Sequence, residues 1–187
     1  MAQKRKNWNG LISGFSASDL VFLDESGCNT DMTRRYAYSF GGSRAVDSAP
    51  LSKPKNTTIL SSIQLNGTLH YTTFSGGTTV ERFKRYLETD LLPHLNGNSV
   101  LIMDNMKSYH ARAVKNLLDS SGVRYIYLPP YSPDLNPIEK LWSKVKAFLR
   151  KFKARTLDVL PNAIQNAFHS VTVSDCSGWF RFCEYVL

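Results

Sequence analysis

A predicted strand, helix and strand at residues 100–128, followed by a proline loop, constrain the fold of this chain most. The apolar run of residues 100–103 ends at Asp104, and a short apolar run closed by a polar turn is typical of a strand buried on both faces. Apolar residues then recur at helical spacing until Gly122, and a second apolar run follows at residues 123–128. The pattern predicts a strand–helix–strand unit of an open α/β sheet, with Asp104 at the carboxyl end of its first strand.

The loop after the second strand contains three prolines within five residues, at positions 129, 130 and 133. It must be rigid and irregular, because each proline fixes φ and removes a backbone donor. The next residues, Asn136-Pro137-Ile138-Glu139, combine a preferred cap residue, a proline at the first helical position and an acid three residues after the cap. They predict a capping box and the start of a helix, with Glu139 in its first turn.

A third acid completes a candidate metal site. Asp24 follows another apolar run, predicted as a strand at residues 20–25. Ligand sites in open α/β sheets lie off the carboxyl ends of the strands, so this topology brings Asp24, Asp104 and Glu139 together. Three carboxylates that converge at one sheet edge predict a magnesium site. Glu25 competes with Asp24 for the position in the site, because successive strand residues point to opposite faces.

The sequence alone also allows purely structural roles for two of these acids. Asp104 and Asn105 together form a common polar turn at the end of a strand. An acid at position 139 is expected in a capping box, where it favours the helix dipole. A capping role and a metal-binding role are compatible for Glu139.

The rest of the chain supplies further strands and helices. β-rich runs at residues 57–65 and 68–74 flank Asn66-Gly67, a strong hairpin signal. A helix capped by Thr78 or Thr79 follows, and further helices are predicted after the proline loop and near the C-terminus. The order is three strands, helix, strand, helix, strand and helices. It predicts an α/β fold with a mixed central sheet of about five strands flanked by helices.

Residues 1–19 are polar and lack periodicity, so they are predicted to be a linker or disordered arm. Residues 20–187 suit one domain with a substantial core. No apolar run reaches the roughly 20 residues of a membrane span, and no signal peptide is apparent, so we expect a cytoplasmic protein without a membrane partner. Three cysteines without a close pair predict reduced thiols.

The net charge of +8 favours a polyanionic partner, although charge alone does not separate DNA from a membrane surface or an acidic protein. Residues 140–157 hold seven cations and no acid. The solvated face of an amphipathic helix would explain them equally well. Next to a carboxylate metal site, contact with the DNA backbone is favoured. The predicted backbone contacts are Lys140, Lys144, Lys146, Arg150, Lys151 and Lys153.

Three segments resemble the catalytic domain of DDE transposases of the Tc/mariner superfamily, particularly its bacterial insertion-sequence branch. They are Leu23-Asp24-Glu25, Met103-Asp104-Asn105 and residues 128–139, which read LPPYSPDLNPIE. Between Asp104 and Glu139 lie 34 residues, positions 105–138, the spacing typical of that superfamily. The resemblance runs from about residue 20 to the C-terminus.

This resemblance implies an RNase H-like fold, two Mg²⁺ ions for which Mn²⁺ can substitute, and cleavage and strand transfer of transposon DNA. The family pattern places the catalytic Asp first in Asp24-Glu25, so Asp24, Asp104 and Glu139 are expected to be catalytic residues and metal ligands. The implied partner is double-stranded DNA, both transposon ends and target, bound by a homodimer. The residues themselves suggest that Asn105, His110 and Asn136 support the ligands or contact DNA, although His110 would equally suit a surface position on its predicted helix.

Two rival functions stay open. A stand-alone RNase H-like nuclease would use the same acids with water as the only nucleophile. A non-catalytic DNA-binding remnant would keep the charge and the fold without activity. Transposases of this kind carry N-terminal helix-turn-helix units, and residues 1–19 are too short to hold one. We therefore expect the catalytic part of a longer protein or a truncated element.

Overall fold

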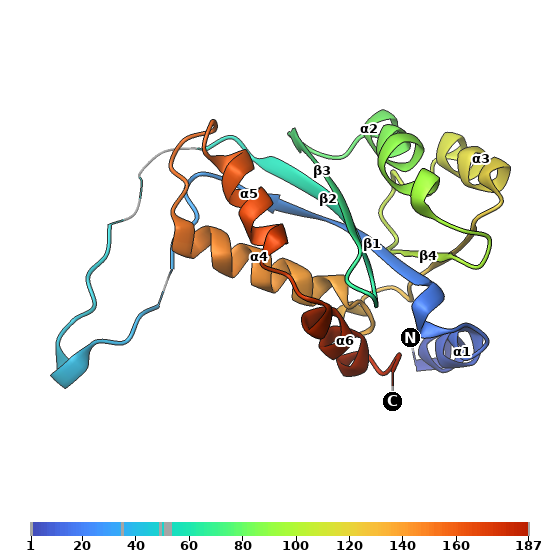
Figure 1. The fold of residues 1–187 in the computed structure, drawn as a ribbon, viewed down its shortest axis with the longest axis horizontal. Coiled ribbons are helices and arrows are strands. Elements are labelled where there is room, and N and C mark those ends of the chain that lie inside the picture. The colour runs from blue at the N-terminus through green and yellow to red at the C-terminus, as the bar shows by residue number, and fades with distance from the viewer. Residues whose placement is uncertain (1, 35, 49, 51–53, 187) are drawn as a thin grey trace.

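One mixed sheet organises the molecule (Figure 1). The computed structural model describes residues 2–34, 36–48, 50 and 54–186, so the outer ends of the predicted arm and domain, residues 1 and 187, lie outside it. In this part of the chain the sheet order is β3-β2-β1-β4-β5, with β1 parallel to β4, β4 parallel to β5, and the other pairs antiparallel. The strands are β1 Leu20–Cys28, β2 Thr57–Gln64, β3 Leu69–Ser75, β4 Val100–Met103 and β5 Arg124–Tyr127. The predicted mixed sheet of about five strands is confirmed.

Helices cover both faces of the sheet (Figure 1). Successive side chains of β1 point to opposite faces of the sheet. Leu20 and Phe22 pack with α4, α5 and α6, whereas Val21 and Leu23 pack with α2 and α3. Two apolar cores therefore lie on opposite sides of one sheet. The helices are α1 Ala2–Ile12, α2 Val80–Tyr86, α3 Arg112–Ser121, α4 Ile138–Phe152, α5 Leu160–His169 and α6 Val173–Phe182.

Local signals in the sequence explain several element ends. The hairpin of β2 and β3 turns at the predicted Asn66-Gly67, where Gly67 has a φ of 87°. Thr79 caps α2 by accepting a hydrogen bond from the backbone N–H of Arg82. Gly122 ends α3 in the left-handed conformation that glycine adopts without a steric cost. These predicted boundaries are confirmed.

The N-terminal segment differs from its prediction as a linker or disordered arm, because α1 occupies most of it. Trp8 and Ile12, four residues apart, lie on one side of the helix and are buried in the core shared with α4 and α6. The indole of Trp8 donates a hydrogen bond to the hydroxyl of Tyr185, 3.2 Å away. The helix could not be predicted from this polar sequence, because it lacks a clear apolar periodicity. Contacts with the far end of the chain stabilise it instead.

The three cysteines are free thiols, as predicted, and all are buried. Burial raises the pKa of Cys28, Cys176 and Cys183 to about 11, so these thiols are protonated and unreactive at neutral pH. Within the described residues, no helix combines the length and the apolar character that crossing a membrane requires.

Candidate active site

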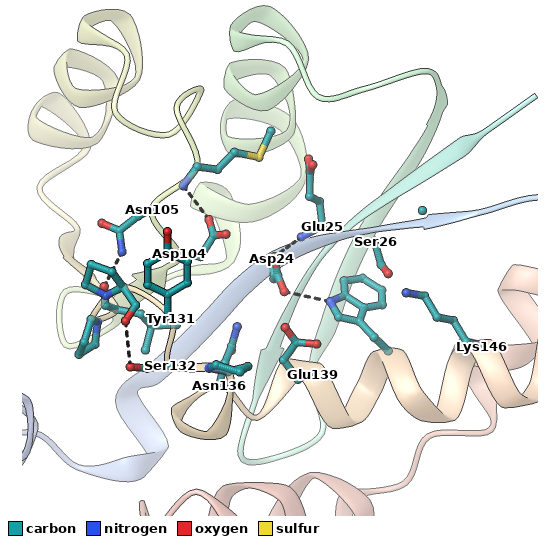
Figure 2. Close-up of a pocket in the computed structure, with 17 residues that line it drawn as sticks. Asp24, Glu25, Ser26, Asp104, Asn105, Tyr131, Ser132, Asn136, Glu139 and Lys146 are labelled. Atoms are coloured by element: carbon teal, nitrogen blue, oxygen red, sulfur yellow. Dashed lines mark hydrogen bonds between the residues drawn. The ribbon is translucent and has the colours of Figure 1, made fainter. Parts of the chain in front are cut away.

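The three predicted acids line one pocket of about 780 Å³ (Figure 2). The pairing of β1 with β4 places two of them side by side: Leu23 lies opposite Met103, so Asp24 and Asp104 follow at the same level of the sheet. Glu139 enters from the first turn of α4, which packs against β1. The structure thus brings the three predicted acids to one pocket.

Asp24 and Glu25 both line the pocket, but the strand pleat turns their side chains to opposite faces of β1. β1 continues three residues beyond its predicted end, so Asp24 lies inside the strand. It shares the face of Leu20 and Phe22, which is the face covered by α4. Figure 2 shows the side chains of Asp24 and Glu139 directed toward each other, whereas that of Glu25 points to the other side of β1.

Asp24 is held by two hydrogen bonds and is only 8% exposed. One carboxylate oxygen accepts from the backbone N–H of Glu25 at 2.7 Å, and the other accepts from the indole N–H of Trp142 at 3.2 Å. Burial raises its pKa to about 7, and the negative charges of Asp104 and Glu139 add to this rise. The site therefore concentrates negative charge that a cation would neutralise.

Asp104 lies just past the end of β4, where the chain turns. Its Oδ1 accepts a hydrogen bond from the backbone N–H of Met106 at 3.0 Å, as in the structural turn that the sequence left open. Burial raises its pKa, against the lowering effect of this hydrogen bond and of nearby His110. The turn fixes the carboxylate at the pocket, so a structural role of Asp104 in the turn is compatible with a role as a metal ligand.

The predicted capping box at Asn136 and Glu139 is wrong. No side chain caps α4, whose cap residue is Pro137, in helical conformation. The helix starts instead through backbone bonds, from the N–H of Glu139 to the carbonyl of Asn136 and from Lys140 to Pro137. Asn136 is buried and lines the pocket, and its Oδ1 has no hydrogen-bond partner among the described residues. The side chain of Asn136 thus lines the pocket and does not cap the helix.

Asn105 and His110 have identifiable contacts near the acids. The amide of Asn105 donates to the carbonyl of Leu128 at 2.6 Å, which ties the turn after β4 to the start of the proline loop. His110 stacks on the ring of Tyr127, with ring centroids 4.1 Å apart. Asn105 lines the pocket, whereas His110 acts on Asp104 through its charge.

Sequence reasoning missed Trp142 as a site residue and did not separate Lys146 from the other cations. Trp142 was read as part of the apolar face of α4, where it does pack against Phe168. Trp142 follows Glu139 by three residues and Lys146 follows Glu139 by seven, so all three lie on one side of the helix and line the pocket. That helical spacing was the signal available in the sequence.

The basic residues of α4 and its C-cap residue, Lys153, divide into two groups. Lys140 lies over the ring of Phe182 at 3.7 Å, Lys144 pairs with Asp175, and Lys153 pairs with Asp47 at 2.7 Å. These three have partners within the chain. Arg150 and Lys151 instead line surface hollows beside the segment that joins β1 to β2, and Lys146 lines the pocket of the acids.

The donor set of the pocket suits a hard divalent cation. Its carboxylates supply the oxygen ligands that Mg²⁺ and Mn²⁺ prefer. The pKa of Asp24 is raised mainly by burial and also by the neighbouring charges of Asp104 and Glu139, both of which a bound cation would offset. In the described part of the chain, no three His, Cys, Asp or Glu side chains already lie in an arrangement that could hold a metal ion. Asp24 and Asp104 are held by N–H donors, and a carboxylate oxygen that accepts one hydrogen bond keeps a lone pair for a metal ion.

Fold and site together define an RNase H-like domain with one acid within β1, one just past the neighbouring parallel strand β4 and one in the first turn of α4. The profile of the family described as DDE superfamily endonuclease matches residues 19–160. The chain belongs to this family. Its similarity to the Transposable element Tc1 transposase of Caenorhabditis elegans is 27% identity over 97 residues, which cover 50% of this chain and 36% of the relative.

Solved structures with the same fold come from the Mos1 transposase. The paired-end complex with the left transposon end superposes with a TM-score of 0.81 at 19% identity, over 96% of this chain and 58% of that one. The paired-end complex with Mn gives 0.80 at 21% identity, with the same shares. The isolated catalytic domain gives 0.69 at 17% identity, over 98% of this chain and 88% of that one. The chain thus spans little more than half of the complete Mos1 chains.

Proposed function

We propose that this chain is the catalytic part of a Tc1/mariner-type transposase, which cuts transposon DNA ends and joins them to target DNA. Membership of the DDE superfamily supports the class of chemistry. The observation that carries the proposal is the meeting of Asp24, Asp104 and Glu139 in one pocket. We also propose that residues 20–187 form this catalytic domain. From the amino-acid sequence of residues 128–139 we further propose that it belongs to the bacterial insertion-sequence branch.

The proposed metal ligands are Asp24, Asp104 and Glu139, for two Mg²⁺ ions or Mn²⁺ in their place. Such ions, when bound, activate the attacking oxygen and stabilise the leaving oxygen of an in-line phosphoryl displacement. The chain's own contribution is to hold the ligands. Trp142 and the N–H of Glu25 orient Asp24, and the turn at Met106 orients Asp104. Glu139 is exposed in the first turn of α4 and can turn toward either acid.

Double-stranded DNA is the proposed partner, with transposon ends and target bound by a homodimer. The solved Mos1 structures include a complex with the left transposon end and a strand transfer complex. In this chain, Lys146 lies in the pocket and gives a phosphate a cation beside the acids. Arg150 and Lys151 extend the basic surface toward the C-terminal end of α4.

Asp104→Asn should abolish strand cleavage without unfolding the protein. Asparagine is close in size and can still accept the hydrogen bond from Met106, but it lacks the charge that a divalent ligand needs. Nicking of supercoiled plasmid in Mn²⁺ measures cleavage, and joining of an oligonucleotide with a free 3′-hydroxyl to that plasmid measures strand transfer. Both should fall below detection.

Asp158→Asn is the matched control, because Asp158 is exposed and lies outside the pocket. It should nick and join as the wild type does. Nicking by Asp104→Asn at the wild-type rate would refute the proposed site. Nicking without any joined product in the wild type would favour a stand-alone nuclease, and inactive wild-type protein that binds DNA would favour a remnant.

DNA binding by the chain should be weak in sequence preference and strongly dependent on salt. Lysine and arginine contacts to phosphate release counterions, so each contact contributes about 0.9 to the slope of log affinity against log salt. The double variant Lys146→Gln, Arg150→Gln should reduce that slope by about two units. Fluorescence anisotropy with a labelled duplex at several salt concentrations measures it.

Lys144→Gln with Lys153→Gln removes the same charge from α4 and its C-cap and serves as the control. Those two lysines are already paired with Asp175 and Asp47, so this variant should change the slope much less. Equal slopes for both double variants would show that the intramolecular pairs open on binding. Strong preference for one duplex over its scrambled sequence would show a base-reading element in this chain.

A further inference from the structure

The proline loop presents an aromatic side chain at the pocket in an unusual backbone conformation. Tyr131 has a φ of 56°, in the left-handed region that residues other than glycine rarely adopt. Its side chain is 86% exposed and lines the pocket of the three acids. Within the part of the chain that the structure describes, its ring stacks on no other ring and its hydroxyl makes no hydrogen bond. No ring or hydroxyl contact of Tyr131 within the described residues therefore explains its strained backbone conformation.

The residues around Tyr131 are fixed although its ring is free. Asn105 anchors the loop where it leaves β5, through the carbonyl of Leu128. Ser132, next to Tyr131, is buried, and a short 3₁₀ helix Pro133–Leu135 follows, whose last carbonyl accepts a hydrogen bond from the hydroxyl of Tyr185 at 2.7 Å. The ring thus projects from a rigid support. A ligand that stacks on it would bind with little loss of conformational entropy, because the loop is already ordered.

We propose that Tyr131 stacks on a nucleobase beside the phosphate that the site cleaves, an inference that rests on the proposed function. A phosphate placed at the acids and Lys146 brings its neighbouring bases to the rim of the pocket, where the ring lies (Figure 2). The ring carries no charge that would recognise phosphate, but its flat face matches that of any base. Exposed aromatic residues at positions 36, 38 and 40 lie instead on the long segment between β1 and β2, which projects away from the sheet in Figure 1.

The stacking partner is an unpaired base, because a base within the duplex is covered by its neighbours. Freeing a base is costly in intact DNA and least so where the base is already unpaired. A short duplex that ends in one unpaired 2-aminopurine is therefore the probe, and the same duplex with an abasic residue at that place is its control. Binding is measured with Ca²⁺ instead of Mg²⁺, so that the readout does not depend on cleavage.

The wild type should bind the duplex with the unpaired base about tenfold more tightly than the abasic duplex, the size expected for one base stacked on an aromatic ring. Tyr131→Phe should keep this difference and the quenching of 2-aminopurine fluorescence. Tyr131→Ala and Tyr131→Gly should lose the difference and leave the affinity for the abasic duplex unchanged. The glycine variant suits a positive φ, so its melting temperature should stay at or near that of the wild type.

Three results would overturn the inference. They are equal affinity of the wild type for both duplexes, equal weakening of both duplexes by Tyr131→Ala, and loss of the difference in Tyr131→Phe. Equal weakening would mean that the ring only shapes the loop or contacts another protein. The proposed function fails by a different result, normal nicking by Asp104→Asn, so the two failures are distinguishable.

Discussion

Glu139→Gln should reduce Mn²⁺-dependent nicking by orders of magnitude and leave the protein folded. A neutral amide is a poor ligand for a hard divalent cation, whereas the carboxylate of Glu139 faces Asp24 across the pocket. The side chain is exposed in the first turn of α4, so glutamine fits without repacking. Loss of a negative charge near the helix N-terminus should cost about 0.3–1 kcal/mol of stability. Plasmid nicking and thermal unfolding measure the two effects.

Glu81→Gln is a close control for this change. Glu81 and Glu139 are both the second residue of their helices, α2 and α4, and both belong to the first turn. The same charge is removed from the same helical position, but Glu81 lies outside the pocket. It should lose a comparable amount of stability and no activity. A Glu139→Gln protein that nicks normally would remove Glu139 from the active site.

The missing capping box makes this comparison sharper than the sequence suggested. If Glu139 reached back to Asn136, glutamine would preserve that bond and mask a structural role. In the structure the helix starts through Pro137 and backbone hydrogen bonds, and Asn136 turns its amide into the pocket. A large effect at position 139 therefore has no explanation in helix capping.

The parts of the fold that were predictable are those in which local pattern and final environment agree. The run of residues 100–103 is apolar throughout because both faces of β4 are buried. Gly122 and Asn66-Gly67 adopt the backbone conformations that their residue types favour. The parallel pairing of β1 with β4 then sets Asp24 beside Asp104. The acids could therefore be placed together from the sequence alone.

Features that depend on distant contacts were not predictable in the same way. β1 runs through Gly27 to Cys28 because Cys28 pairs with Thr57 of β2, although the sequence Gly27-Cys28-Asn29 suggests a turn. Trp142 has the spacing of a core residue, and only its contact with Asp24, 118 positions away, shows its role in the site. The cations of α4 look alike in the sequence, yet Asp175 and Asp47 neutralise two of them from other elements.

In metal-free buffer the free energy of unfolding should fall as pH rises from about 4 to about 7, in part because of Asp24. The pKa of this group is about 7 in the folded protein, mainly through burial, and about 3.9 in an unfolded chain. Between these values the unfolded chain has released a proton that the folded protein still holds, so rising pH favours unfolding. At about 1.4 kcal/mol per pH unit the loss is at most about 4 kcal/mol.

Asp24→Asn isolates this contribution from other groups that titrate in the same range, such as His70, whose pKa is lowered by burial. The variant should show a smaller loss of stability between pH 5 and pH 8, measured by urea denaturation with a chelator present. Mg²⁺ should stabilise the wild type more at pH 8 than at pH 5, because it binds the ionised acids and not the unfolded chain. The variant should lose most of that stabilisation and all detectable nicking. An unchanged pH dependence in Asp24→Asn would mean that Asp24 is ionised in the metal-free protein, and an unchanged response to Mg²⁺ would remove it from the proposed ligands.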